Sequence, residues 1–196
     1  MLSWLLVPVA YLLGTFPTAI LVGRRRGRDV TREGSGNPGA TNALRTMGRR
    51  AGVAVLVGDL GKGVLAAATG LLVSHGLAVA CGVAAVLGHV APVTRGFRGG
   101  KGVATAAGVV FVCFPLVGLA LAVVWAAVVV PTRLSSLASV TIAALLPVGV
   151  AIDGRPGREV AAAALVGALV VLRHRENLVR LVRGEERRVG QRGPAA

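Results

Sequence analysis

Residues 103–130 read VATAAGVVFVCFPLVGLALAVVWAAVVV, and how this apolar run folds decides the fold of the whole chain. A helix that crosses a bilayer needs about 20 apolar residues. The run is therefore long for one spanning helix and short for two. We expect two short helices that turn near Phe114 and Pro115, for a reason that lies in the charges outside the run.

The composition is that of an integral membrane protein, with 54% hydrophobic and only 15% charged residues. No segment alternates apolar and polar residues as a membrane β-strand does, and no internal repeat stands out. We therefore predict one all-α membrane-embedded domain over residues 1–196. The further apolar runs are roughly 1–23, 51–73, 76–94, 135–152 and 158–173.

The basic residues favour the turn inside the long run. With that turn the chain has seven spans, and nineteen of its 22 basic residues fall on one side of the bilayer, while the opposite side holds only Arg155 and Arg158. Cytosolic loops carry the excess of Lys and Arg. We predict seven transmembrane helices, an outside N-terminus and a cytosolic C-terminus, with 174–196 as a basic cytosolic tail. The basic segments on the cytosolic side are 24–50, 94–102, 131–135 and 173–196.

Other classes of protein fit the sequence poorly. The net charge of +14 suggests nucleic acid, but the chain has only one Tyr and two Trp for stacking and no nucleic-acid-binding motif. Cys81 and Cys113 lie in apolar stretches without metal-ligand spacing. The first 23 residues lack a basic leader and an A-x-A site, so we expect a retained first span. No cofactor or metal motif is present in the sequence, and we predict neither.

Only two of the 22 basic residues are lysine, and both are framed by glycines. They are Lys62 in GDLGKG and Lys101 in FRGGKG. Lysine offers a compact point charge with three donors, which the planar guanidinium of arginine does not. A charge at the end of an apolar run is costly and marks a candidate functional site.

The segment GSGNPGATNALR, residues 34–45, is the first of four polar clusters that the predicted topology places on the cytosolic face. Backbone N–H groups of a loop rich in glycine can turn toward an anion. Arg45 can bind a phosphate through two parallel hydrogen bonds. The expected ligands of the anion in this loop are Gly34, Ser35, Gly36, Asn37, Gly39, Thr41, Asn42 and Arg45.

The second cluster pairs Asp59 with Lys62, which share a helix face at this spacing. Two interpretations stay open. The residues form a buried ion pair that only packs the bundle, or Lys62 faces the polar site while Asp59 holds it.

The third cluster is GHVAPVTRGFRGGKGVAT, residues 88–105. Gly99, Gly100 and Gly102 would let the backbone around Lys101 approach a ligand closely, at the start of the next helix, whose dipole favours an anion. The histidine of this segment reads more simply as a packed, hydrogen-bonded residue.

The fourth cluster is HRENLVRL, residues 174–181, where the last span meets the cytosol. His174 and Asn177 share a helix face and can point inward together. Ser139 and its neighbouring serines add hydroxyl donors, or they only cap a helix. Cationic loops and amides on one membrane face predict a phosphate-bearing ligand, and the surrounding lipid predicts a second, apolar one.

Together these segments resemble the bacterial acyl-phosphate:glycerol-3-phosphate acyltransferase family. The similarity runs in order through GSGNPGATNALR, DLGKG, GHVAPVTRGFRGGKGVAT, SSLAS and HRENLVRL…GEE, over nearly the whole chain. GTFPTA in the first span also resembles the family's N-terminal segment, with Thr15 where serine is expected.

The resemblance implies a seven-helix enzyme of the bacterial inner (plasma) membrane with its active site on the cytosolic side. Such an enzyme transfers a fatty acyl group from acyl phosphate to the 1-hydroxyl of glycerol 3-phosphate, giving lysophosphatidic acid and phosphate. It needs no cofactor and no obligatory protein partner. The implied catalytic residues are Ser35, Arg45, Lys101, His174 and Asn177. The implied substrate-binding residues include Thr41, Lys62, Gly99, Gly100, Ser139 and Glu176.

Two rival functions remain at this point. A transporter for organic phosphates or other anions would use the same basic loops, but it would need polar residues along a path through the bilayer. A lipid-binding subunit without catalysis would not need so many glycine-framed polar motifs.

Overall fold

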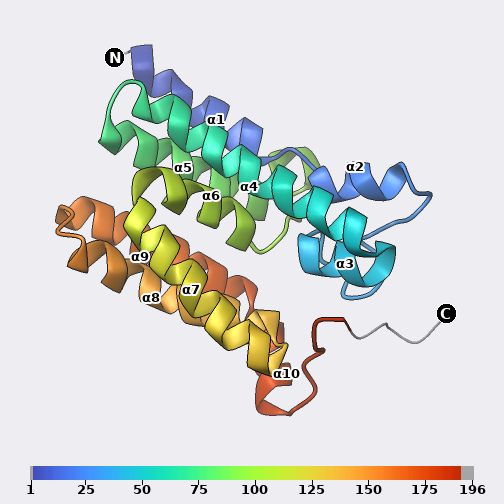
Figure 1. Cartoon of the computed structure of the whole chain (residues 1–196). Helices are drawn as coiled ribbons and strands as arrows, with labels where there is room; N and C mark the ends of the chain where they lie inside the picture. The colour runs from blue at the N-terminus through green and yellow to red at the C-terminus, as the bar shows by residue number, and fades with distance from the viewer. Residues whose placement is uncertain (1, 191–196) are drawn as a thin grey trace.

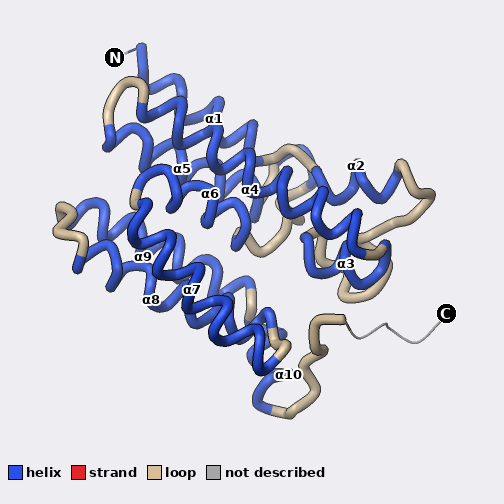
Figure 2. Tube along the Cα trace, viewed as in Figure 1, coloured by secondary structure: helices blue, strands red, loops and turns tan. Residues whose placement is uncertain are grey.

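The computed structural model describes residues 2–190, and in that range helices are joined by loops, with no strand (Figure 2). Ten α-helices follow one another along the described residues, and the segment Thr15–Pro17 separates the first two. Two short 3-10 helices, Leu2–Leu5 and Val93–Arg95, accompany them. The α-helices are α1 (Leu6–Gly14), α2 (Thr18–Arg24), α3 (Ala40–Met47), α4 (Arg49–Leu71), α5 (His75–Val90), α6 (Val103–Cys113), α7 (Pro115–Thr132), α8 (Ser135–Ile152), α9 (Gly157–Arg173) and α10 (Arg175–Val182).

The predicted break in the long apolar run is confirmed. Helix α6 ends at Cys113 and α7 begins at Pro115, with Phe114 in a non-helical conformation (φ −141°, ψ 67°) between them. Proline lacks the N–H that would continue the first helix, and its fixed φ suits the first position of the next. The run therefore forms an 11-residue helix and an 18-residue helix.

Five helical stretches of the described residues are long and apolar enough to cross a membrane. Helices α6 and α9, of 11 and 17 residues, are shorter. The seven-span count therefore stays a prediction. The five long stretches are Leu2–Arg24, Arg49–Leu71, His75–Arg95, Pro115–Thr132 and Ser135–Ile152.

The helices form two packed groups (Figure 1). Helix α4 packs on α5 and α6, and α1 covers α5, while α7, α8 and α9 pack on one another. The α6–α7 corner and contacts between α5 and α9 join the groups. Helices α2, α3 and α10 gather at one end of the bundle, and the α4–α5 and α8–α9 turns lie at the other (Figure 1).

Glycines allow helices α4 and α6 to touch backbone to backbone. A Cβ on Gly63 would lie 2.1 Å from the carbonyl oxygen of Thr105, and one on Gly108 would lie 2.2 Å from that of Leu60. Small residues permit such close approach between helices in lipid. This contact fixes the start of α6, and with it the loop that precedes α6.

Replacing Gly63 by alanine is expected to destabilise the protein by about 1–3 kcal/mol, because the added methyl group overlaps the Thr105 carbonyl. Thermal unfolding in detergent measures the loss. Gly61→Ala is the matched control, since no atom lies within 4 Å of a Cβ at that position of the same helix. Equal stability of the two variants would contradict the packing account.

Candidate active site

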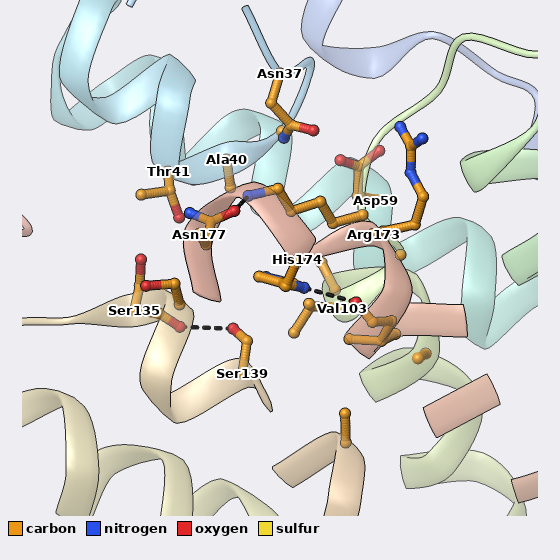
Figure 3. Close-up of a pocket in the computed structure, with 18 of the residues that line it drawn as sticks. Asn37, Ala40, Thr41, Asp59, Val103, Ser135, Ser139, Arg173, His174 and Asn177 are labelled. Atoms are coloured by element: carbon orange, nitrogen blue, oxygen red, sulfur yellow. Dashed lines mark hydrogen bonds between the residues drawn. The ribbon is translucent and has the colours of Figure 1, made fainter. Parts of the chain in front are cut away.

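A cavity of about 1290 Å³ lies between the two groups of helices. At the end near α2, α3 and α10 its wall is polar, and along α6, α7, α8 and α9 its wall is apolar. Figure 3 shows the polar end, where Asn37 and Thr41 face Asn177 and His174, with Ser135 and Ser139 on a third side. The cavity thus joins a site for a polar group to a groove for a hydrocarbon chain.

The loop before α6 brings Lys101 to the polar end. Arg173 holds this loop from α9, since its guanidinium donates to the carbonyl oxygens of Gly99 at 3.0 Å and Gly100 at 3.3 Å. The Gly100 N–H donates to the His89 carbonyl oxygen at 3.1 Å. The loop is therefore fixed to α5 and α9 on either side of the lysine.

The glycines of this loop serve packing inside the protein. A Cβ on Gly99 would lie 2.0 Å from the His89 carbonyl oxygen, and one on Gly100 would lie 2.2 Å from Nε2 of the same histidine. Gly102 has a φ of +86°, a left-handed conformation that suits glycine, and α6 begins directly after it. Direct contact between these glycines and a ligand stays a prediction.

Lys101 begins a network of hydrogen bonds, called here the Lys101–Asn177–Glu186 network. Its ammonium group donates a hydrogen bond to Oδ1 of Asn177 (Figure 3), whose Nδ2 donates to Glu186 Oε1 at 2.6 Å. Arg180 donates to the other oxygen of Glu186 at 2.8 Å. Asn177 is buried and its amide orientation is set from both sides, so Lys101 has a fixed position at the cavity wall.

Burial and neighbouring charges determine the protonation of Lys101 and Glu186 in this network. Burial lowers the pKa of Lys101 to about 8, although Glu186 opposes the shift. Burial also acts to raise the pKa of the Glu186 carboxyl, but the hydrogen bonds from Arg180 and Asn177 outweigh it and keep that pKa low. At neutral pH this network therefore consists of the charged Lys101 ammonium, the neutral Asn177 amide and the Glu186 carboxylate.

His174 is buried and lies beside the Lys101–Asn177–Glu186 network, at the end of α9. Its Nδ1 lies 2.8 Å from the Val170 carbonyl oxygen and must carry the proton to make that bond. Burial, with the charge of Lys101 as the next cause, lowers the pKa of His174 to about 4. The imidazole is thus neutral at physiological pH, and its Nε2 is left as a hydrogen-bond acceptor.

The Asn42 side chain holds the glycine-rich loop in place through hydrogen bonds to the backbone of the loop and of the residues just before it. Its Oδ1 accepts the Ser35 N–H at 2.9 Å, and its Nδ2 donates to the carbonyl oxygens of Val30 and Glu33 at 2.9 and 3.0 Å. Gly34 and Gly36 turn the chain with φ values of +63° and +69°. The polar atoms of Asn42 are thereby occupied, and direct binding of a ligand by Asn42 stays a prediction.

Replacing Asn42 by alanine is expected to loosen the loop over residues 34–39, because three hydrogen bonds disappear and a buried site empties. Each buried group left unsatisfied costs about 1–3 kcal/mol. Hydrogen exchange at the Ser35 amide should become faster. Thr69→Val is the control, because the Thr69 hydroxyl bonds only within its own helix, to Leu65. Unchanged protection at Ser35 would contradict this role.

The remaining predicted residues lie at different depths. Ser35 and Thr41 are exposed at the cavity wall, and Arg45 is half-buried there, with a pKa that burial lowers. Glu176 is exposed at the rim. The Ser139 hydroxyl lines the cavity but donates to the Ser135 carbonyl oxygen at 2.7 Å (Figure 3).

Lys62 is not among the residues that line this cavity. Its ammonium lies 3.0 Å from Asp59 Oδ1 and donates to the Phe16 carbonyl oxygen at 3.2 Å, in the interruption between α1 and α2. Asp59 lines the cavity instead (Figure 3), and its Oδ1 lies 3.6 Å from Nδ1 of His89. The pair is buried, and the carboxylate is the member that reaches the site.

Among the charged residues of this site that sequence reasoning missed are Asp59, Arg173, Arg180 and Glu186. Asp59 was noticed only as the partner of Lys62. The arginines belong to a basic segment with no pattern that separates them from their neighbours. Glu186 reaches the site only because the chain turns back after α10.

Fold and cavity define a class: a multi-pass helical membrane protein with a cationic, amide-lined pocket that opens into an apolar groove. Such a site suits a ligand that carries both a phosphate and a hydrocarbon chain.

The comparisons with known proteins name the family. The family model described as glycerol-3-phosphate acyltransferase matches residues 4–184. The chain is 46% identical to the glycerol-3-phosphate acyltransferase of Thioalkalivibrio sulfidiphilus, covering 98% of this chain and 96% of the relative. It is 44% identical to that of Methylococcus capsulatus, covering 96% of each. The chain belongs to the glycerol-3-phosphate acyltransferase family.

Two solved structures are similar along almost the whole chain. The glycerol 3-phosphate form of PlsY (YgiH), an integral membrane glycerol 3-phosphate acyltransferase, has a TM-score of 0.92 at 39% identity and covers 97% of this chain and 96% of its own. The lysophosphatidic acid form has a TM-score of 0.88 at 39% identity, covering 96% and 95%.

Proposed function

We propose that this protein transfers a fatty acyl group from acyl phosphate to the 1-hydroxyl of glycerol 3-phosphate, releasing lysophosphatidic acid and inorganic phosphate. The observation that carries the proposal is the continuity of the cavity, from the cationic end at Lys101 to the apolar walls of α6 to α9. The forms of PlsY solved with glycerol 3-phosphate and lysophosphatidic acid support the acceptor and the product.

The donor suits a site without a strong nucleophile. Acyl phosphate is a mixed anhydride with a good leaving group, so positioning and neutralisation of charge supply most of the catalysis. The acceptor hydroxyl oxygen forms a bond to the acyl carbon, the bond from that carbon to the phosphate oxygen breaks, and the hydroxyl proton leaves. Lys101, Arg45 and the 34–42 loop hold phosphate groups, while Asn177 and His174 orient the hydroxyl or the carbonyl.

Two groups can accept the hydroxyl proton: an oxygen of the substrate phosphate, or Nε2 of His174. The low pKa of His174, about 4, makes its imidazole a weak base. We therefore favour the phosphate oxygen as the final acceptor. In this mechanism the hydroxyl first donates its hydrogen bond to Nε2 of His174, which positions the hydroxyl oxygen beside the acyl carbon. The proton then passes to the phosphate oxygen as the oxygen–carbon bond forms.

The membrane topology is part of the proposal. We propose seven spans, with α6 and α9 as the short ones, an outside N-terminus and an active site on the cytosolic side of the bacterial inner membrane. The excess of basic residues around the polar end of the cavity supports this orientation. The predicted tail 174–196 begins at His174, and its residues 191–196 lie outside the described residues. No cofactor or obligatory protein partner is needed for this chemistry.

The test uses purified protein in proteoliposomes with labelled glycerol 3-phosphate. Palmitoyl phosphate, palmitoyl-coenzyme A and palmitoyl-acyl-carrier protein are offered separately as donors. The proposal expects labelled lysophosphatidic acid from palmitoyl phosphate alone. Lysophosphatidic acid formed from a thioester but not from palmitoyl phosphate would contradict acyl phosphate as the donor. Uptake of glycerol 3-phosphate into the vesicles without acylation would favour a transporter.

A further inference from the structure

We propose that the corner between α6 and α7, where Phe111 lies against Gly118, closes the acyl-chain groove and sets the longest acyl group that the enzyme uses efficiently. The inference rests on the proposed function and concerns a property that the sequence did not predict. It follows from where the cavity ends, from the packing at that end and from what holds the corner in place.

The cavity wall locates the end of the groove. Four apolar residues line it farthest from Lys101, one on each of the four surrounding helices: Phe111, Gly118, Leu146 and Val166. At a rise of 1.5 Å per residue, Phe111 lies about 12 Å along α6 from Val103 at the polar end. A long saturated chain that begins at the polar end therefore reaches this layer before its last methylenes.

Buried side chains fill the bundle just beyond this layer. They belong to one hydrophobic cluster, are at most 6% exposed and do not line the cavity. A close-packed interior offers no room for further methylenes. The filled layer is made by Cys113, Phe114, Val117, Val150 and Ala163.

Phe111 and Gly118 fit each other closely. A Cβ on Gly118 would lie 2.9 Å from Cδ1 of the Phe111 ring and 3.3 Å from its Cα. The ring occupies the space that a side chain at position 118 would need. The size of the residue at either position therefore changes the depth of the groove.

Polar contacts at the far end of the bundle hold this corner in place. His75, at the start of α5, has Nε2 at 2.9 Å from the Cys113 carbonyl oxygen and Nδ1 at 3.1 Å from Glu159 of α9. The Arg155 guanidinium lies 5.4 Å from the centre of the Phe114 ring. Groups from α5, from α9 and from the turn between α8 and α9 thus fix the end of α6, and with it the closed end of the groove.

A rigid end of the groove selects among acyl groups by their length. A hydrophobic pocket distinguishes one methylene by about 10- to 200-fold in kcat/KM. Chains that stop short of the corner gain contact with each added methylene, whereas longer chains must bend or leave the groove. The rate should fall beyond a definite length.

The test is the profile of kcat/KM over saturated acyl phosphates from octanoyl to stearoyl. Phe111→Ala should move the optimum to longer chains and Leu146→Phe to shorter ones, each changing the ratio of long to short substrate by about tenfold or more. Leu119→Ala is the control, because Leu119 is 60% exposed on α7 and does not line the cavity. Thermal unfolding identifies a variant that fails to fold, in which case the other variant decides.

Wild-type profiles in folded Phe111→Ala and Leu146→Phe would overturn the inference and leave the proposed function standing. If the wild-type protein forms no lysophosphatidic acid from any acyl phosphate, the proposed function itself fails. A shift of equal size in Leu119→Ala would also overturn the inference, because the corner would then have no special part in the selection.

Discussion

Replacing Lys101 by alanine is expected to lower kcat/KM about a thousandfold, which corresponds to about 4 kcal/mol of lost transition-state stabilisation. The structure holds the ammonium at the cavity wall through Asn177, which Glu186 holds in turn. Its loss removes the neutralisation of a substrate phosphate and leaves the Asn177 amide oxygen without its donor. Steady-state kinetics with palmitoyl phosphate and glycerol 3-phosphate measure the effect.

Two further variants separate charge from geometry. Lys101→Arg keeps the charge but replaces a compact ammonium by a larger planar group, and it should also lose most of the activity. Arg50→Ala removes a positive charge from an exposed residue that does not line the cavity, and should change kcat/KM little. Unaltered KM and kcat in Lys101→Ala would refute the role of Lys101 in holding phosphate.

The same lysine predicts a decline of activity in alkaline solution. Burial lowers its pKa to about 8, so the charged form that binds phosphate is complete well below pH 8 and is lost above it. We expect kcat/KM, which reports the free enzyme, to fall about tenfold per pH unit beyond that point. In Lys101→Arg the guanidinium stays charged, and this decline should be absent. A profile flat to pH 10 in the wild type would contradict the assignment.

The second large effect is expected at His174, where alanine should lower kcat about a hundredfold or more. The variant loses the Nε2 acceptor beside Lys101 and empties a buried position at the end of α9. Because the pKa of the imidazole is about 4, the part of the acid limb that depends on His174 should lie near pH 4 and not near 6.5. The pH dependence of kcat/KM in the wild type and the variant measures both effects.

His174→Gln distinguishes orientation from base catalysis. Glutamine also offers a hydrogen-bond acceptor, so it should retain clearly more activity than alanine if the histidine orients the hydroxyl. Near-full turnover in the glutamine variant would eliminate His174 as the general base. A phosphate monoester also titrates near pH 6, so the limb is assigned by comparing variants. An acid limb near pH 6.5 that disappears in His174→Gln would contradict the neutral, buried imidazole of the structure.

Local chemistry explains which features were predictable. The break between α6 and α7 follows from the missing N–H of Pro115, and four polar segments stand out against 54% hydrophobic residues. The structure brings residues of all four segments to one cavity wall, with Ser35, Asp59, Lys101 and Asn177 among them. Whether each of them contacts substrate stays a prediction.

The features that were not predicted depend on contacts between distant segments. Lys62 bonds to the Phe16 carbonyl oxygen only because the first apolar run is interrupted before Pro17, whereas the hydropathy of residues 1–23 indicates one uninterrupted span. Gly99 and Gly100 pack on His89, which lies ten residues earlier. Glu186 returns to Asn177 from beyond α10. None of these pairings has a periodic signal in the sequence.

The most direct test of the account is the stoichiometry of the two products. Lysophosphatidic acid and inorganic phosphate are measured in parallel during turnover of acyl phosphate with glycerol 3-phosphate, in the wild-type protein and in Lys101→Ala. We predict one phosphate for each lysophosphatidic acid in the wild type, and a parallel loss of both in the variant. Phosphate released without lysophosphatidic acid, or acyl transfer unaffected by the loss of Lys101, would contradict a single site in which the cationic end of the cavity carries out the transfer.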